Sequence, residues 1–284
     1  MALTDRARLR ELLERHGFTF SKAMGQNFLV NPSVCPRMAE LGGAAPGVGV
    51  LEIGPGVGVL TAELARRAGR VVCVELDPRL PPILAETLAE FDNVEIVLGD
   101  VMEVDLQSLI AGRFGGMPVV VCANLPYYIT TPILMRLLES RLPIEAITVM
   151  VQKEAAERML SQPGDKNWCA TAATVRYFAE PSMVMEAPAS LFTPPPHVDS
   201  ALLRLEMRET RAVPAEREEA FLNLIQVAFR MRRKTLANNL TAGLSLSRTD
   251  ALRALEAAGL DERVRGETLT LADFERLAEA LHEK

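Results

Sequence analysis

The sequence predicts an α/β protein with a mostly parallel sheet, helices on both faces of that sheet, and a small all-helical domain after it. Short runs of small and β-branched apolar residues recur up to residue 207, and helical segments separate them. After about residue 208 the strand pattern stops and amphipathic helical periodicity continues to the end of the chain. We therefore expect domains at residues 1–207 and 208–284.

The expected sheet has seven strands. A helix at residues 5–16, marked by Leu9, Leu12 and Leu13, precedes it, and residues 20–32 resemble a loop. Two strands are expected near residues 177–185 and 199–207, and the second alternates its side chains as an antiparallel strand does. The remaining five strands are separated by helices near residues 57–68 and after Pro78, and are expected at residues 50–53, 70–75, 94–98, 119–123 and 144–151.

Three or four helices are expected in the C-terminal domain. Residues 215–229 place Phe221, Leu224, Ile225 and Ala228 on one helical face. Two capping boxes indicate later helix starts, because a hydroxyl is followed three residues on by a carboxylate. These capping boxes are Ser247 with Asp250 and Thr270 with Asp273.

The composition is that of an ordinary globular protein. The 284 residues are 49% hydrophobic and 24% charged, and no apolar run approaches the roughly 20 residues of a membrane-spanning helix. The N-terminus lacks the apolar core of a signal peptide. The four cysteines are far apart and form no C-x-x-C pair, so we expect buried thiols, no metal site and no disulfide. We expect a cytoplasmic protein with no membrane partner.

A glycine-rich loop follows the first expected strand of the sheet. Gly54, Gly56 and Gly58 allow a tight turn and a close approach of the backbone to a ligand. Their G-x-G-x-G spacing departs from the G-x-G-x-x-G pattern of dinucleotide-binding proteins, which disfavours a dehydrogenase. The shorter loop suits a nucleoside that carries methionine better than a pyrophosphate.

Two carboxylates stand at the ends of the next two expected strands. Glu75 lies 19 residues after Gly56, where an acidic residue commonly accepts hydrogen bonds from ribose hydroxyls. Asp100 ends the third strand and can accept a hydrogen bond from an adenine amino group. Each of them alone could be a turn or cap residue, but the loop and both carboxylates at successive strand ends indicate a nucleoside site.

The most informative segment is Asn124-Leu125-Pro126-Tyr127, directly after the fourth expected strand. Ligands of open α/β sheets bind at such carboxyl ends. The Asn124 amide oxygen and the Leu125 carbonyl can accept hydrogen bonds from an aromatic amine, Pro126 stiffens the turn, and Tyr127 can stack on the ring. The segment resembles the N-P-P-Y signature of methyltransferases that act on an adenine amino group.

A basic cluster lies in the expected helical domain. The net charge is −6, yet residues 204–284 carry 14 basic and 14 acidic side chains. Four cations without an intervening acid can contact phosphates, although a solvated helix end is the alternative interpretation. The cluster comprises Arg230, Arg232, Arg233 and Lys234.

Over nearly its full length the chain resembles the small-subunit ribosomal RNA adenine dimethyltransferases, the KsgA family. The resemblance implies a Rossmann-like methyltransferase domain with S-adenosylmethionine as cofactor. It implies N6,N6-dimethylation of two adjacent adenosines in the 3′-terminal hairpin loop of small-subunit ribosomal RNA, within an assembling subunit. The matching segments are residues 25–29, 51–58, 75–77, 99–100, 124–127, 192–200 and 229–236.

The resemblance also implies residue roles. Asn27 and Leu29 would close over the cofactor, and Gly54 and Gly56 would contact it through the backbone. Phe192 would stack on the target base opposite Tyr127, whereas without the motif it would be taken as a core aromatic. Glu75 would bind the ribose of the cofactor, and Asp100 would bind its adenine. Asn124 would contact both the cofactor and the target amine. The residues implied to bind RNA are Arg230, Arg232, Arg233 and Lys234.

Two segments depart from the family pattern, Ser21-Lys22-Ala23-Met24 with one basic residue and Asn167-Trp168-Cys169-Ala170-Thr171. Two alternatives stay open at this point. One is a large-subunit ribosomal RNA adenine methyltransferase of the macrolide-resistance type, and the other is a mainly non-catalytic ribosome assembly factor. The F-x-x-R-R-K-T run at residues 229–235 favours the small-subunit enzyme, and no apolar stripe indicates a dimer, so we expect a monomer.

Overall fold

The computed structural model describes residues 4–19, 27–29 and 31–282 and divides the chain into two compact units. The first unit consists of Met1–Ala156 and Ser182–Met207, and the second consists of Glu157–Pro181 and Arg208–Lys284. Across the described ranges, no helix is both long enough and apolar enough to cross a membrane. The departing segment Ser21–Met24, like Gly25 and Gln26, lies outside the described residues.

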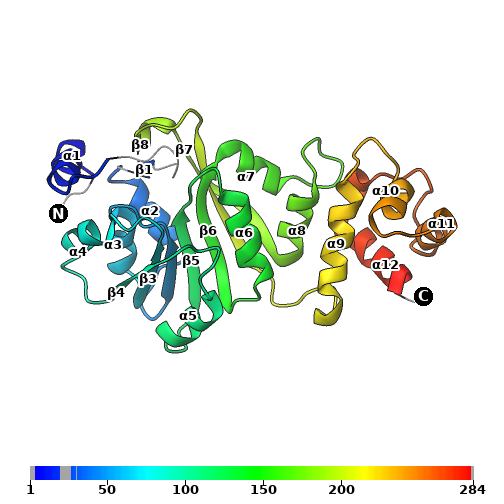
Figure 1. The fold of residues 1–284 in the computed structure, drawn as a ribbon, viewed down its shortest axis with the longest axis horizontal. Coiled ribbons are helices and arrows are strands. Elements are labelled where there is room, and N and C mark those ends of the chain that lie inside the picture. The colour runs from blue at the N-terminus through cyan, green and yellow to red at the C-terminus, as the bar shows by residue number, and fades with distance from the viewer. Residues whose placement is uncertain (1–3, 20–26, 30, 283–284) are drawn as a thin grey trace. The chain divides into compact units, whose positions relative to one another are not determined.

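A seven-stranded sheet, in the order β4-β3-β2-β5-β6-β9-β7, confirms the predicted fold class (Figure 1). Strands β2 to β6 pair in parallel, and β9 pairs antiparallel with β6, as its alternating side chains predicted. The strands of the sheet are β2 (Gly49–Ile53), β3 (Arg70–Glu75), β4 (Val94–Leu98), β5 (Val119–Asn124), β6 (Ile144–Gln152), β7 (Ala179–Ala187) and β9 (Ser200–Met207).

The register brings the carboxyl ends of β2 to β5 to one edge of the sheet. Ile53 lies opposite Val74, and Glu75 lies opposite Leu98. Asn124 ends β5 opposite Met150 of β6. The loops that follow these strands therefore converge, although they are far apart in the sequence.

Both faces of the central strands of the sheet are buried. Alternate residues of the central strands, such as Val50, Val71 and Val120, pack into one core with the first four helices, and their neighbours Leu51 and Val72 are equally buried. This double burial explains why the strands are continuous apolar runs in the sequence. The helices of this unit are α1 (Arg6–Arg15), α2 (Val34–Leu41), α3 (Val59–Ala65), α4 (Pro81–Thr87), α5 (Leu106–Arg113) and α6 (Thr130–Glu139).

A two-stranded antiparallel ribbon lies outside the main sheet. Its strands are β1 (Phe28–Leu29) and β8 (Phe192–Thr193), and Leu29 pairs with Phe192. A short 3-10 turn, Ala189–Leu191, precedes β8. Two-residue strands carry no periodicity, so the sequence indicated only a loop at residues 20–32.

The second unit is helical. Its helices include α8 (Ala170–Phe178), α9 (Glu218–Phe229), α10 (Leu236–Gly243), α11 (Arg248–Ala257) and α12 (Leu271–His282), with 3-10 turns at Ala215–Arg217 and Gly266–Thr268. Both predicted capping boxes are present. The Ser247 hydroxyl accepts a hydrogen bond from the Asp250 N–H at 3.0 Å, and the Thr270 hydroxyl accepts one from Asp273 at 3.1 Å.

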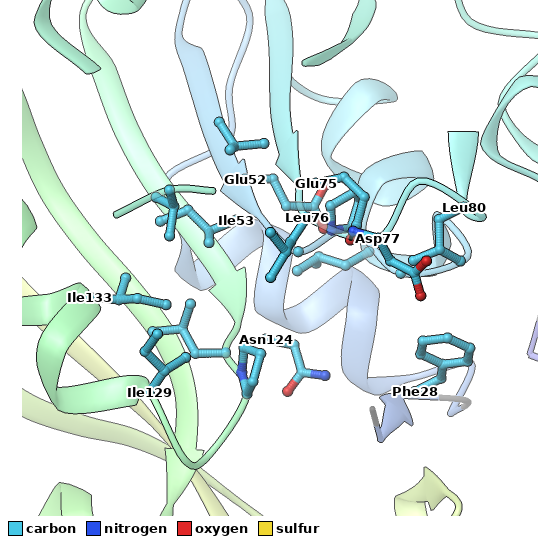
Figure 2. Close-up of a pocket in the computed structure, with 18 of the residues that line it drawn as sticks. Phe28, Glu52, Ile53, Glu75, Leu76, Asp77, Leu80, Asn124, Ile129 and Ile133 are labelled. Carbon is cyan, nitrogen blue, oxygen red and sulfur yellow. Dashed lines mark hydrogen bonds between the residues drawn. The ribbon is translucent and has the colours of Figure 1, made fainter. Parts of the chain in front are cut away.

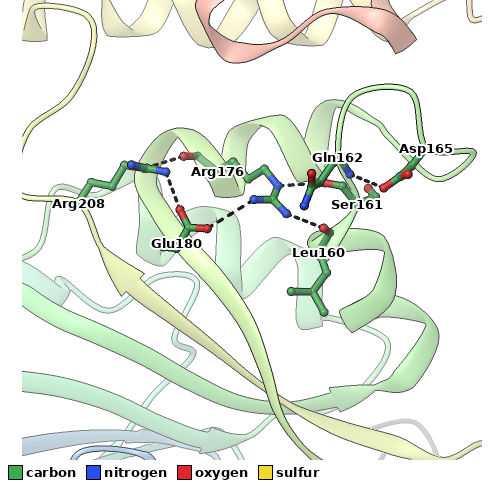
Figure 3. A network of polar contacts seen from close by, with 7 residues as sticks. All are labelled: Leu160, Ser161, Gln162, Asp165, Arg176, Glu180 and Arg208. Carbon is green, nitrogen blue, oxygen red and sulfur yellow. Dashed lines mark hydrogen bonds and ion pairs between the residues drawn. The ribbon is translucent and has the colours of Figure 1, made fainter.

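Residues 157–181 belong to the second unit, whereas the sequence placed them in the first domain. Arg176 donates to the carbonyls of Leu160 at 2.6 Å and Ser161 at 3.0 Å, which holds the end of α7 (Lys153–Leu160) against α8 (Figure 3). Arg208 donates to the Arg176 carbonyl at 2.9 Å and to Glu180 at 2.8 Å. These long-range contacts carry no local sequence signal.

Trp168 is the centre of this packing. Its side chain is fully buried, its indole N–H donates to the Leu269 carbonyl at 3.1 Å, and its ring meets Phe229 edge-on at 6.2 Å. Phe229 in turn packs on Phe274 at 6.1 Å. The departing segment around Trp168 therefore forms part of the core of the second unit and does not line the site described below.

Gly49 offers a test of the packing beneath the sheet. A Cβ atom at Gly49 would lie 2.3 Å from the Phe114 ring, so Gly49→Ala forces the ring or the strand to move. We expect Gly49→Ala to lower the free energy of unfolding by about 1–3 kcal/mol, the usual cost of overpacking. Urea denaturation followed by circular dichroism measures this change.

Gly112 is the matched control, because it lies in α5 and a Cβ atom there would meet no neighbour within 4 Å. Gly112→Ala should leave stability unchanged or raise it by about 0.5–1 kcal/mol. If the two variants have equal stability, the tight contact between Gly49 and Phe114 is wrong.

Candidate active site

A cavity of about 200 Å³ opens at the carboxyl edge of the sheet (Figure 2). The loops after β2, β3, β4 and β5 form its walls, and β1 contributes Phe28 and Leu29. Ten of the predicted site residues line it together: Asn27, Leu29, Gly54, Gly56, Glu75, Asp100, Asn124, Leu125, Pro126 and Tyr127.

The loop after β2 adopts backbone conformations that favour glycine. Gly54, Gly56 and Gly58 have φ values of +68°, +58° and +87°, a region that side chains with a Cβ atom rarely adopt. A Cβ atom at Gly54 would meet nothing within 4 Å, whereas one at Gly56 would lie 3.0 Å from the Phe28 ring. The backbone therefore lies bare beside the cavity, and Phe28 packs closely on it.

Glu75 ends β3 with a buried carboxylate. It accepts a hydrogen bond from the Asp77 N–H at 2.7 Å. Burial raises the pKa of Glu75 to about 7 and the nearby Asp77 carboxylate adds to this, while backbone N–H donors that include Gly56 lower it. Near neutral pH this carboxyl is therefore poised between its charged and neutral forms.

Glu52 is a site residue that the sequence interpretation missed. It is the penultimate residue of β2, is 1% exposed and lines the cavity. Burial raises its pKa to about 7, a hydrogen bond from the Cys73 thiol at 3.4 Å acts in the other direction, and Glu75 raises it further. The signal available in the sequence was its place inside an apolar run, because acidic side chains are rarely buried in a strand unless they have a functional or structural role.

Asp77 is a second missed carboxylate in the wall of the cavity. Its side chain is 2% exposed and forms an ion pair with Arg79 at 2.6 Å. The Arg79 guanidinium also stacks on the Phe18 ring at 4.7 Å and donates to the Thr19 carbonyl at 3.2 Å. These contacts fasten the chain after α1 to the wall of the cavity.

Asp100 follows β4 in a tight turn. Its carboxylate accepts a hydrogen bond from the Met102 N–H at 2.8 Å, which fixes its orientation. The Glu75 carbonyl accepts from the Gly99 N–H at 2.8 Å, so the ends of β3 and β4 stay together. The two carboxylates that the sequence assigned to one nucleoside therefore line one cavity.

Asn124 joins the turn after β5 to the N-terminal ribbon. Its amide NH₂ donates to the Asn27 carbonyl at 3.1 Å. The amide oxygen is therefore the acceptor end of the side chain, as a role in holding an amine requires. Figure 2 shows Asn124 between Phe28 and Ile129 in the wall of the cavity.

A closed turn positions the residues after Asn124. The Ile129 N–H donates to the Pro126 carbonyl at 3.3 Å, and the Thr130 hydroxyl donates to the same carbonyl at 3.0 Å. The Tyr127 hydroxyl lies 2.5 Å from the Ser200 hydroxyl, which ties the turn to β9. Burial raises the pKa of Tyr127, so its phenol stays neutral.

Phe192 lies apart from the other predicted catalytic residues. Its side chain is fully buried in the core of the first unit, and it does not line the cavity within the described part of the chain. Because β8 pairs with β1, Phe192 lies beside Leu29 instead. Its stacking role stays a prediction that requires the ring to become accessible.

The lining of the cavity is acidic. Four carboxylates face it, while the described lining residues include no Lys, Arg or His; the acids are Glu52, Glu75, Asp77 and Asp100. This set suits a ligand with hydroxyl and amino donors and a positive charge, and it disfavours a pyrophosphate. S-adenosylmethionine, a nucleoside with a sulfonium and an ammonium group, has this chemistry.

The predicted RNA-binding residues lie in the second unit, in the turn between α9 and α10. Arg230, Arg232, Arg233 and Lys234 are all exposed. The buried Asn239 side chain holds this turn, because its oxygen accepts from the Met231 N–H at 2.9 Å. Arg232 also donates to the Lys166 carbonyl at 2.8 Å, so the loop before Trp168 lies beside the cluster.

The chain is similar over nearly its full length to known ribosomal RNA methyltransferases. A family model described as ribosomal RNA adenine dimethylase matches residues 17–283. The ribosomal RNA small subunit methyltransferase A of Geobacillus thermodenitrificans is 46% identical over 278 residues, covering 96% of this chain and 95% of that protein. The protein of the same name from Anoxybacillus flavithermus is 44% identical over 279 residues, covering 97% and 95%.

Two solved structures resemble most of the chain. A dimethyladenosine transferase from Plasmodium falciparum has a TM-score of 0.77 at 26% identity and covers 89% of this chain and 96% of its own. The 23S rRNA methyltransferase ErmE has a TM-score of 0.69 at 30% identity and covers 90% and 100%.

The fold and the acid-lined cavity define an S-adenosylmethionine-dependent methyltransferase. Within that class, the match over residues 17–283 and the identities of 44–46% are decisive. The chain belongs to the ribosomal RNA adenine dimethylase family.

The pKa of Glu75 generates a prediction for cofactor binding. Ribose hydroxyls donate to the charged carboxylate, so binding favours the ionised form of a group whose pKa is about 7. We expect the affinity for S-adenosylmethionine to rise with pH through 7, with about tenfold weaker binding at pH 6 than at pH 8. Titration calorimetry from pH 5.5 to 8.5 measures this.

Glu75→Gln is the control, because it removes the titration of this carboxyl and leaves any titration of the ligand unchanged. The variant should bind more weakly at pH 8 and lose the rise in affinity. A wild-type affinity that does not vary between pH 6 and pH 8 would contradict this role of Glu75. The Glu52→Gln variant shows how much of the rise belongs to the second carboxyl.

Proposed function

We propose that the protein transfers methyl groups from S-adenosylmethionine to N6 of two adjacent adenosines in the 3′-terminal hairpin loop of small-subunit ribosomal RNA. The products are N6,N6-dimethyladenosines, formed by a monomeric enzyme on an assembling subunit in the cytoplasm. The observation that carries this proposal is Asn124, which ends β5 at the wall of an acid-lined cavity and is fixed by the Asn27 carbonyl. The small-subunit substrate rests on the names of relatives 44–46% identical to this chain.

In this proposal the cofactor lies along the carboxyl edge of the sheet. Glu75 accepts hydrogen bonds from its ribose, and Asp100 accepts one from its adenine amino group. Gly54 and Gly56 let the backbone lie close to it, while Asn27 and Leu29 cover it. When bound, the sulfonium supplies an activated methyl group, so transfer needs positioning and exclusion of water more than it needs a strong base.

The target adenine is held by the turn after β5. The Asn124 oxygen and the Leu125 carbonyl accept its N–H groups, which favours a more pyramidal and more nucleophilic nitrogen. Pro126 keeps the acceptors in place, and Tyr127 stacks on the ring, with Phe192 as the second face if its ring becomes accessible. A base in a hairpin loop costs less to extrude than a base in a duplex, which suits this substrate.

A methyl-transfer assay with labelled S-adenosylmethionine and separated, under-methylated ribosomal subunits tests the proposal. The wild-type protein should label the small subunit and produce two dimethyladenosines. Asn124→Ala should reduce kcat by about 100-fold or more, because an acceptor that acts in the transition state is lost. Circular dichroism should show that the variant stays folded.

Three outcomes would contradict this assignment. Labelling of large subunits in place of small ones would favour the macrolide-resistance type of enzyme. Binding to small subunits without any transfer would favour the assembly factor. Full activity of Asn124→Ala would remove Asn124 from the proposed mechanism.

We propose that the cluster Arg230, Arg232, Arg233 and Lys234 contacts RNA phosphates. The double variant Arg232→Glu with Arg233→Glu should weaken RNA binding and lower the salt dependence of log K by about 1.4, about 0.7 for each lost phosphate contact. Affinity for S-adenosylmethionine should be unchanged. Filter binding at several salt concentrations measures the first effect, and calorimetry measures the second.

Arg253→Glu with Arg263→Glu provides a control of equal charge. Both side chains lie in the same unit, and they are 70% and 88% exposed. An equal loss of RNA binding in this control would assign the effect to net charge and not to a local contact.

A further inference from the structure

The turn after β5 presents a second tyrosine that none of the roles above uses. Tyr128 lines the cavity and is 58% exposed. The large apolar side chains exposed in the described residues are Leu76, Leu98, Met117, Tyr128 and Val198. Tyr128 is the aromatic one among them and is the most exposed, so the cavity has an open ring face at its mouth.

A backbone hydrogen bond closes the turn that carries Tyr128. Tyr127 and Tyr128 are the central residues of the turn that the hydrogen bond from Ile129 to Pro126 closes. Tyr127 is tied to Ser200 on the inner side of this turn, while its neighbour extends outward. A ring on a fixed turn loses little conformational freedom when it binds a ligand, because a tyrosine side chain has only two χ angles.

The surroundings of Tyr128 limit what it can bind. The carboxylates of the cavity repel phosphates, so recognition of a ligand through a phosphate is disfavoured there. A flat aromatic face at the mouth of an acidic pocket suits a nucleobase, which stacks through its π-face and needs no charge. Single-stranded loops of RNA offer such unstacked bases.

We propose that Tyr128 forms a second nucleobase subsite, which stacks on the base next to the target adenine. Consecutive Cα atoms lie about 3.8 Å apart, so two rings on one turn can serve two neighbouring nucleotides. Tyr127 holds the reacting base and Tyr128 holds its neighbour. This inference rests on the proposed function, and it explains how a substrate with two adjacent adenosines stays aligned while one of them reacts.

Steady-state methyl transfer to small subunits tests the subsite with the whole protein. Tyr128→Ala should raise KM for the subunit about tenfold, the effect of one lost stacking contact, with kcat within about twofold of the wild type. Affinity for S-adenosylmethionine should not change. Tyr128→Phe keeps the ring face and should behave as the wild type.

Met117→Ala is the matched control, because Met117 is also exposed but precedes β5 at the opposite end of the strand. It should leave KM and kcat unchanged. A hairpin RNA that carries 2-aminopurine beside the target adenosine adds a direct readout. Its fluorescence should be quenched by the wild type and by Tyr128→Phe, and not by Tyr128→Ala.

The outcomes separate this inference from the function on which it rests. If the wild type labels small subunits and Tyr128→Ala keeps the wild-type KM, the subsite is wrong and the proposed function stands. If Tyr128→Ala weakens S-adenosylmethionine binding as much as it raises KM, the ring belongs to the cofactor site and the subsite is again wrong. If the wild type labels no small subunits, the proposed function and the subsite both fall.

Discussion

The parallel alignment of β2, β3, β4 and β5 is the constraint on which the rest of the site depends. Parallel strands all end at the same edge, so Gly54, Glu75, Asp100 and Asn124, far apart in the chain, meet around one cavity. Two hydrogen bonds then fix the orientation of two of these side chains. The Asn27 carbonyl orients Asn124, and the Met102 N–H orients Asp100.

Much of this arrangement could be predicted, because position after a strand is a local property of the sequence. Apolar runs marked the strands, and polar residues at or just after the ends of these strands marked Glu75, Asp100 and Asn124. Glu52 was missed because it lies inside such a run, and Phe28 because its place over Gly56 depends on a two-residue strand. The burial of Phe192 likewise follows from pairing across more than 160 residues, which no local pattern encodes.

In the second unit, too, local features were predictable from the sequence and long-range contacts were not. Its helix starts were predictable from capping boxes, whose partners are three residues apart. Its boundary was not, because residues 157–181 join it through the indole of Trp168 and the guanidinium of Arg176. Such contacts bring together carbonyls and rings that are distant in the sequence. A segment that departs from the family pattern thus turns out to be a core segment with its own partner, Phe229.

The buried carboxyls Glu52 and Glu75 have a consequence for the fold itself. Both have a pKa of about 7 in the folded protein, above the ordinary glutamate value of 4.5, so folding takes up protons between these two values. The unfolded chain binds fewer protons in that range, and the stability of the fold therefore falls as pH rises from about 4.5 to 7. At neutral pH these two carboxyls therefore lower the stability of the fold. A ligand that favours their ionised form would return part of that stability at neutral pH, so the same two side chains link proton uptake, folding and occupancy of the site.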